Sequence, residues 1–260
     1  MNDPSTTTLV LMAVAAVCAG WVDAVVGGGG LIQLPALLLG FPQASPVQIL
    51  ATNKLSSICG TSVSAVTYYR RVRPDPRTAI PLALLAFSGS LIGALLASRI
   101  PKAAFSPIIL VVLVGVGAYT LLTPKLGRVT DLRFSGRPHV LAATGVGFVV
   151  GMYDGALGPG TGSFLVFALV GLLGYAFLEA SAKAKIANVA TNLAALVIFI
   201  PAGAVMWKIG LLMGLGNLAG GYLGARTAVA RGGAFIRIGF VLVVGAFIIR
   251  IGLDVVDQLF

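Results

Sequence analysis

Two lysines lie inside apolar stretches of this chain, where a membrane protein rarely places a charge. Lys54 and Lys185 are 131 positions apart, counted from position 54 to position 185. An ionisable side chain within a membrane segment is costly and by default functional, and an ammonium group there can bind an anion. The structural alternative is that each lysine lies near the start of its helix and extends to the membrane interface.

Polar side chains follow both lysines at steps of three and four residues, which places them on one face of a helix. In the first predicted helix, over 47–69, they are Lys54, Ser57, Thr61, Ser64 and Tyr68. In the second, over 178–201, they are Lys185, Asn188 and Asn192. Thr52 and Asn53 directly precede Lys54 and extend the polar surface around it. We interpret Ser57, Thr61, Asn188 and Asn192 as neutral hydrogen-bond donors beside the two charges.

Glycine-rich runs interrupt two further apolar segments. Gly27–Gly30 lie within "WVDAVVGGGGLIQLPALLLG", and the second run reads Gly158-Pro159-Gly160-Thr161-Gly162. Glycines in membrane helices usually serve close packing, but four in a row cannot continue a stable helix. Irregular backbone at membrane depth must be buried or line a cavity, so the runs predict an interior cavity. The N-terminus of a helix that follows such a turn can bind an anion.

One carboxylate precedes each glycine run, Asp23 in the first and Asp154 in the second. Three roles are open to them: a salt bridge to Lys54 or Lys185, a cap for the broken helix, or a proton carrier for coupled transport. The first two roles are structural and together take precedence.

The composition requires that these residues be held by membrane helices. Of 260 residues, 58% are hydrophobic and 10% are charged, and the mean hydropathy is +1.00, outside the range of soluble domains. We predict an all-α integral membrane protein with a single transmembrane domain over 1–260 and about seven or eight transmembrane helices. The apolar segments are 9–39, 47–69, 78–98, 104–123, 139–175, 178–201, 208–229 and 233–253.

The offset of 131 residues between the lysines also relates Asp23 to Asp154 and the two glycine runs to each other. "GSLIGALLASR" and "GNLAGGYLGAR" match at a slightly smaller offset. We therefore predict two homologous repeats, 9–123 and 139–253, joined by a basic linker, 124–138. Repeats with interrupted helices at their interface are typical of secondary transporters. They are parallel if the glycine segments pass straight through and inverted if these segments are re-entrant, and we favour the inverted version.

The net charge of +10 arises mainly from short loops between apolar segments. Nucleic-acid binding is not expected, because the positive-inside rule explains these loops better and places them in the cytoplasm. One loop holds Arg70, Arg71, Arg73 and Arg77, and the other holds Lys125, Arg128, Arg133 and Arg137. The inverted version adds Arg226, Arg231 and Arg237 to the same side.

Enzyme chemistry finds little support in the residues. His139 is the one histidine and lies at the edge of the linker, and Cys18 and Cys59 have no metal-ligand or disulfide spacing. We expect no catalytic residue, no metal site and no cofactor, and the chain has no Walker A motif for ATP.

The combination of glycine-interrupted first helices, the polar Thr52-Asn53-Lys54 segment and a two-repeat chain of this size resembles the sulfite exporter TauE/SafE family of bacterial membrane transporters. The resemblance covers about residues 9–253. It implies a secondary carrier, a multi-pass permease of the cell inner membrane, that moves sulfur-containing anions such as sulfonates, sulfite and thiosulfate. The second copy departs from the pattern, because Lys183-Ala184-Lys185 stands where the first has Thr52-Asn53-Lys54.

A sulfonate head is a compact oxyanion that backbone N–H groups, hydroxyls and lysines can bind. The residues expected to bind it are Gly28, Gly29, Gly30, Gln33, Thr52, Asn53, Lys54, Ser57, Gly160, Thr161, Gly162, Lys185, Asn188 and Asn192, with Asp23 and Asp154 as proton-coupling candidates. The partners expected are thus a small anionic substrate and the lipid bilayer, and assembly into a homo-oligomer stays open. An anion channel or a carrier of small carboxylates is the alternative function, ahead of an integral-membrane enzyme.

Overall fold

The computed structural model describes residues 4–97 and 127–259. Their secondary structure is helical, which confirms the all-α prediction. The helices are α1 (Thr6–Val26), α2 (Gly30–Gly40), α3 (Pro46–Val72), α4 (Pro76–Leu96), α6 (Gly136–Ala156), α7 (Thr161–Gly171), α8 (Phe177–Phe199) and α9 (Trp207–Leu259). The predicted segment 104–123 lies outside the described residues. The long helix α9 is two helices that meet at Gly232, whose φ of 76° breaks the helical path.

The lengths of these helices fit a membrane protein. Among the described residues, α1, α4 and α8 are long and apolar enough to cross a bilayer, by length and composition. The helices α2 and α7 have 11 residues each, about 16 Å, and are too short to span a hydrocarbon core of about 30 Å.

Each short helix turns back beside the helix before it. A Cβ on Gly40, at the end of α2, would lie 3.1 Å from Met12 and 3.4 Å from Thr8 at the start of α1. Beyond the end of α7, the Tyr175 hydroxyl lies 2.5 Å from His139 Nε2 at the start of α6. The pairs α1–α2 and α6–α7 are therefore helical hairpins that enter the molecule and return to the end where they began.

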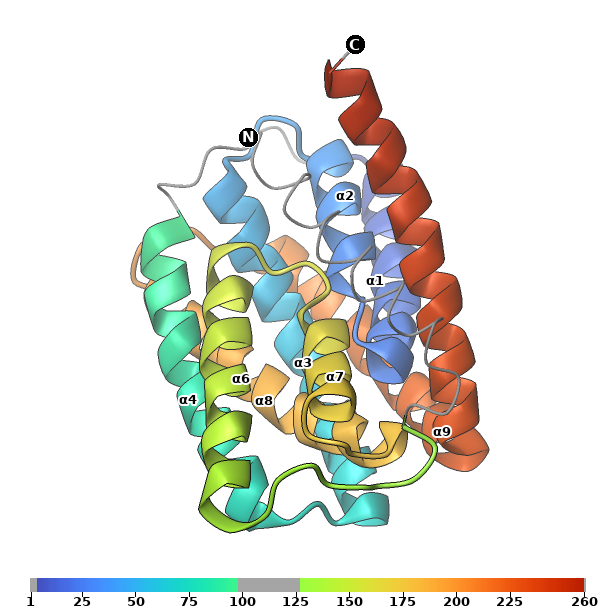
Figure 1. Cartoon of the computed structure of the whole chain (residues 1–260). Coiled ribbons are helices and arrows are strands. Elements are labelled where there is room, and N and C mark those ends of the chain that lie inside the picture. Colours follow the sequence, from blue (N-terminus) through green and yellow to red (C-terminus); the bar gives the residue numbers. More distant parts are fainter. Residues whose placement is uncertain (1–3, 98–126, 260) are drawn as a thin grey trace.

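Glycines bring two pairs of parallel helices into backbone contact, and both pairs join opposite halves of the chain. In the first pair, α4 and α6 (Figure 1), Gly147, Gly151 and Gly155 face the carbonyls of Leu82, Ala86 and Ser90 in that order. In the second pair, α1 and α9, the contacts of Gly216, Gly220 and Gly224 are with the backbone of Ala13, Val17 and Trp21. Small residues permit this close approach in membranes.

The contacts also fix the directions of the helices. Gly210 lies against Leu55 and Gly221 against Gly60, so α3 runs parallel to α9 and therefore to α1. A short turn at Arg73–Asp75 reverses the chain into α4. Because α6 is parallel to α4, α6 runs opposite to α1. Opposite directions are what the inverted interpretation requires, while the repeat boundaries stay a prediction.

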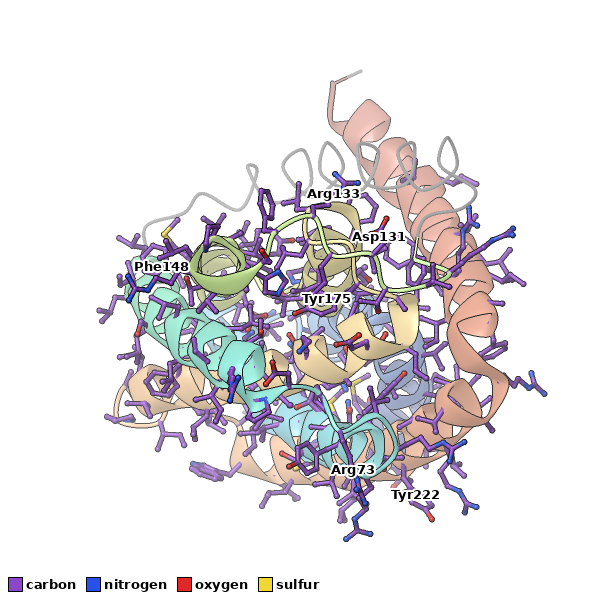
Figure 2. The ribbon with its side chains drawn as sticks, turned by 60° about the horizontal axis from the view of Figure 1, so that its bottom comes forward. Arg73, Asp131, Arg133, Phe148, Tyr175 and Tyr222 are labelled. Carbon is purple, nitrogen blue, oxygen red and sulfur yellow. The ribbon has the colours of Figure 1, made fainter. Side chains whose placement is uncertain are left out.

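One end of the molecule gathers the basic residues. The linker reaches the start of α8, where Phe177 N donates to Gly127 O at 2.9 Å, and Gly233 lies beside Phe177. Arg73 and Arg133 both lie on the end that comes forward in Figure 2. The arginines of this end are Arg70, Arg71, Arg73, Arg77, Arg128, Arg133 and Arg137, with Arg226, Arg231 and Arg237 flanking the break in α9.

Candidate functional site

Two buried ion pairs lie inside the bundle. Lys54 Nζ on α3 is 2.6 Å from Asp154 Oδ2 on α6, and Lys185 Nζ on α8 is 2.8 Å from Asp23 Oδ2 on α1. The Lys54 and Lys185 side chains are 2% and 1% exposed. Neither lysine extends to the membrane interface, because each is held by a carboxylate inside the protein.

The pairing is crossed, since each lysine binds the aspartate of the other half. Each lysine is eight residues into its helix, about 12 Å from the helix start. Because α3 and α8 begin at opposite ends of the molecule, the Lys54 pair lies nearer one end and the Lys185 pair nearer the basic end.

The two aspartates have different surroundings. The Asp154 side chain is 5% exposed and the Asp23 side chain 15%. Asp154 Oδ1 accepts a hydrogen bond from Thr161 Oγ1 at 2.6 Å. Asp23 Oδ1 receives the N–H of Gly29 at a long 3.5 Å, and Lys185 also donates to the Asp23 backbone oxygen. Of the three roles open to the aspartates, both residues form the salt bridge, and Asp23 also caps the following helix weakly.

The two glycine runs, Gly27–Gly30 and Gly158–Gly162, interrupt the helices and are called the glycine breaks below. They contact each other directly. Gly27 has φ +87°, and a Cβ there would overlap the backbone of Gly162 and Ser163. Ser163 N donates to Gly27 O at 3.1 Å, and Ser163 Oγ donates to Val26 O at 2.8 Å. The backbone groups at this contact are therefore satisfied by the opposite half, where the sequence predicted a cavity.

Some of the predicted donors already bind within the protein. Thr161 Oγ1 contacts Asp154 Oδ1 and Gly158 O. Gln33 is fully buried and donates to Ser56 Oγ at 3.2 Å, while Ser57 Oγ lies 3.5 Å from Gln33 Oε1. These side chains would have to exchange a protein partner for a substrate atom.

Asn53 and Asn188 lie beside the glycine breaks. Asn53 Nδ2 is 3.8 Å from the position of a Cβ on Gly30, and Asn188 Nδ2 is 2.9 Å from that of a Cβ on Gly162. Within the described part of the chain, the Oδ1 atom of each asparagine is buried and accepts no hydrogen bond. Orphaned acceptors of this kind are uncommon in folded proteins, and each of the two amides therefore has an oxygen that is free to accept a hydrogen bond.

The remaining predicted residues are near the site or apart from it. Gly28 packs against Val22 and Val243, and Gly160 against Leu31 and Phe164. Asn192 Nδ2 lies 3.4 Å from Thr61 Oγ1 and links α8 to α3. Thr52 accepts the N–H of Met206 at 3.1 Å, which ties α3 to the connection before α9 and takes its hydroxyl away from the ion pairs.

Two polar residues outside the predicted set link α3 and α8 to their neighbours. Asn217 on α9 donates to Ser56 at 3.4 Å, and Ser90 on α4 donates to Thr191 O at 2.8 Å. Ser90 and Asn217 hold the same place in the matching glycine motifs of α4 and α9. That match between the two copies was the available signal, because both copies place a polar residue at the same point of an apolar helix.

Lys183 lies apart from the ion pairs, toward the basic end. Its side chain is buried, with Nζ 3.5 Å from Asp75 O, 3.8 Å from Glu179 and 4.8 Å from the centre of the Tyr175 ring. A cavity of about 750 Å³, lined in part by Asp75, Tyr175 and Glu179, adjoins this cluster.

Comparison with known proteins gives a consistent result. Residues 12–251 match the family described as "Sulfite exporter TauE/SafE". The "Probable membrane transporter protein ORF9" of a Sinorhizobium species is 39% identical over 98% of this chain and 96% of its own length. A "Probable membrane transporter protein" of Haemophilus influenzae is 37% identical over 84% of this chain and 84% of its own length. The "Probable membrane transporter protein YfcA" of Escherichia coli K12 is 38% identical over 85% of this chain and 81% of its own length. No solved structure matches the chain.

Proposed function

Because the chain belongs to the sulfite exporter TauE/SafE family of membrane transporters, we propose that it is a secondary carrier of small sulfur-containing anions such as sulfonates, sulfite and thiosulfate. Membership in a transporter family agrees with the expectation that the chain is not an enzyme. The word "sulfite" in the family description and the chemistry of the buried groups support this substrate class.

The observation that carries this proposal is the pair of buried lysines beside the glycine breaks. A buried ammonium group is costly, and its bond to a carboxylate inside the protein compensates for that cost. A sulfonate has the single charge of that carboxylate and one more oxygen atom, so it can take the place of the carboxylate. The side-chain N–H groups of Asn53 and Asn188, which lie beside the glycine runs, then donate to the remaining oxygens.

The arginine-rich end supports a multi-pass orientation in the bacterial inner membrane. Positively charged loops remain in the cytoplasm, and the three groups of arginines lie at the same end. The Lys185 pair is then nearer the cytoplasm and the Lys54 pair nearer the periplasm.

Thermal unfolding of the purified full chain in detergent tests the substrate class. Sulfite, thiosulfate, sulfate, taurine, ethanesulfonate, benzenesulfonate and carboxylate controls are added in turn. A ligand that binds only the folded state raises the melting temperature by mass action. We expect stabilisation by sulfur oxyanions over carboxylates, lost in Lys54→Ala and Lys185→Ala.

Lys208→Ala is the matched control, because it removes an exposed lysine at the start of α9. It should keep the response to the anions. Equal stabilisation of the wild-type protein by carboxylates would contradict the sulfur-anion assignment, and an unchanged response in both Lys54→Ala and Lys185→Ala would contradict the site.

A further inference from the structure

The four charges of the buried site balance. Lys54 and Lys185 contribute two positive charges, and Asp154 and Asp23 contribute two negative charges at 2.6 and 2.8 Å from them, respectively. An anion that enters without a compensating charge leaves the site with a net charge of minus one. An uncompensated charge in the membrane interior is strongly disfavoured. A second species must therefore enter or leave with the anion.

We propose that a monovalent substrate anion is bound together with one proton, which Asp154 accepts when Lys54 transfers from Asp154 to the anion. This inference rests on the proposed function, because it names the coupling ion of the same site. The balance is complete: one anion and one proton enter, the Lys54 ammonium keeps its charge, and the Asp154 carboxylate becomes a neutral carboxyl. The net charge of the site stays at zero.

The surroundings of Asp154 differ from those of Asp23 at the oxygen that faces the lysine. Among the described residues, no donor gives Asp154 Oδ2 a hydrogen bond of normal geometry, although Lys54 Nζ is 2.6 Å away. Once Lys54 leaves, this oxygen has no remaining partner and can carry the proton. Each aspartate keeps one hydrogen bond at its other oxygen, from Thr161 Oγ1 at 2.6 Å in Asp154 and from the Gly29 N–H at 3.5 Å in Asp23. The two differ in exposure: the Asp23 side chain is three times as exposed, so its charge depends less on its lysine than the charge of Asp154 does.

The other charged and titratable groups near the site already have partners. Tyr153, next to Asp154, donates to Pro159 O at 2.6 Å, and Tyr68, near Asp23, donates to Ala24 O at 3.0 Å. On α4, Arg77 is in the first turn; on α8, Lys183 and Glu179 lie toward the same basic end. Arg226 on α9 donates to Tyr222 at the surface, at 3.1 Å.

Proteoliposomes that contain the full chain and an internal pH indicator test this coupling. Ethanesulfonate and benzenesulfonate serve as probes because both stay monovalent. An inward sulfonate gradient, with the membrane potential clamped, should acidify the interior at one proton per anion. The uptake rate should not depend on the clamped potential, because no net charge moves.

Binding of the same sulfonates by the detergent-purified protein gives a second readout. If one proton is bound with the anion, the affinity weakens about tenfold for each unit of rising pH. Asp154→Asn, which resembles the protonated carboxyl, should still bind the anion but lose this pH dependence and the proton movement. Asp131→Asn, at an exposed position in the linker, is the control for removal of a carboxylate.

The outcomes separate this inference from the proposed function. Saturable sulfonate uptake that moves charge without acidification overturns proton coupling and leaves the carrier in place. Absence of both binding and uptake for every anion at every pH overturns the carrier and the coupling together. The vesicle measurement on the wild-type protein tests proton coupling even if the Asp154→Asn variant does not fold.

Discussion

Lys54 and Asp154 are both buried, and each depends on the other for its charge to be tolerated. Helical spacing placed Lys54 on a polar face, and its position within a membrane segment indicated a function. That spacing could not identify the partner, since Asp23 and Asp154 have equivalent places in the sequence. The structure pairs each lysine with the aspartate of the opposite half.

The crossed pairing predicts which double substitution restores stability. Lys54→Met leaves the Asp154 carboxylate buried and unpaired, and should lower the free energy of unfolding by about 3–5 kcal/mol. Adding Asp154→Asn removes the orphaned charge and should recover much of this loss. Adding Asp23→Asn should recover none. Thermal unfolding of the three variants in detergent measures this, and recovery by Asp23→Asn would contradict the crossed pairing.

Among the helices, the close contacts of α4 with α6 and of α1 with α9 depend on glycines spaced four residues apart. The spacing was visible in the sequence and predicted helix packing. It could not show that the packed helices run parallel and belong to opposite halves. The sequence also did not show that the two glycine runs contact each other, because the irregular backbone of a broken helix can either line a cavity or pack against another such segment.

Substitutions on α6 test these contacts. A Cβ on Gly151 would overlap the Ala86 carbonyl oxygen, whereas a Cβ on Gly145 would meet no atom within 4 Å. Gly151→Ala should therefore separate α6 from α4 and destabilise the protein by about 1–3 kcal/mol. Gly145→Ala should be neutral or stabilising, because alanine favours a helix over glycine. Melting temperatures that fall equally for both variants would argue against the contact.

For the whole molecule, the basic end relates the fold to the membrane. The sequence predicted two cytoplasmic loops and left the side of Arg226, Arg231 and Arg237 dependent on the repeat orientation. In the structure α1 and α6 run in opposite directions, and these arginines lie at the same end as the two loops.

Labelling of introduced cysteines checks this orientation. In a background without Cys18 and Cys59, Asp131→Cys in the linker should react with a membrane-impermeant maleimide only in inside-out vesicles. Ala202→Cys, in the exposed turn between α8 and α9 at the opposite end, should react only from the outside of intact spheroplasts. Labelling of both from the same side would exclude the arrangement.

The sequence by itself determined that the chain lies in a membrane, where its helices are, and which residues carry charge at membrane depth. Each depends on local composition: apolar length, consecutive glycines, or a lysine within an apolar segment. Only the tertiary structure decided that the glycine breaks meet and that each lysine pairs across the halves. These contacts join positions at least 100 residues apart, and an internal match relates equivalent positions without showing which of them touch.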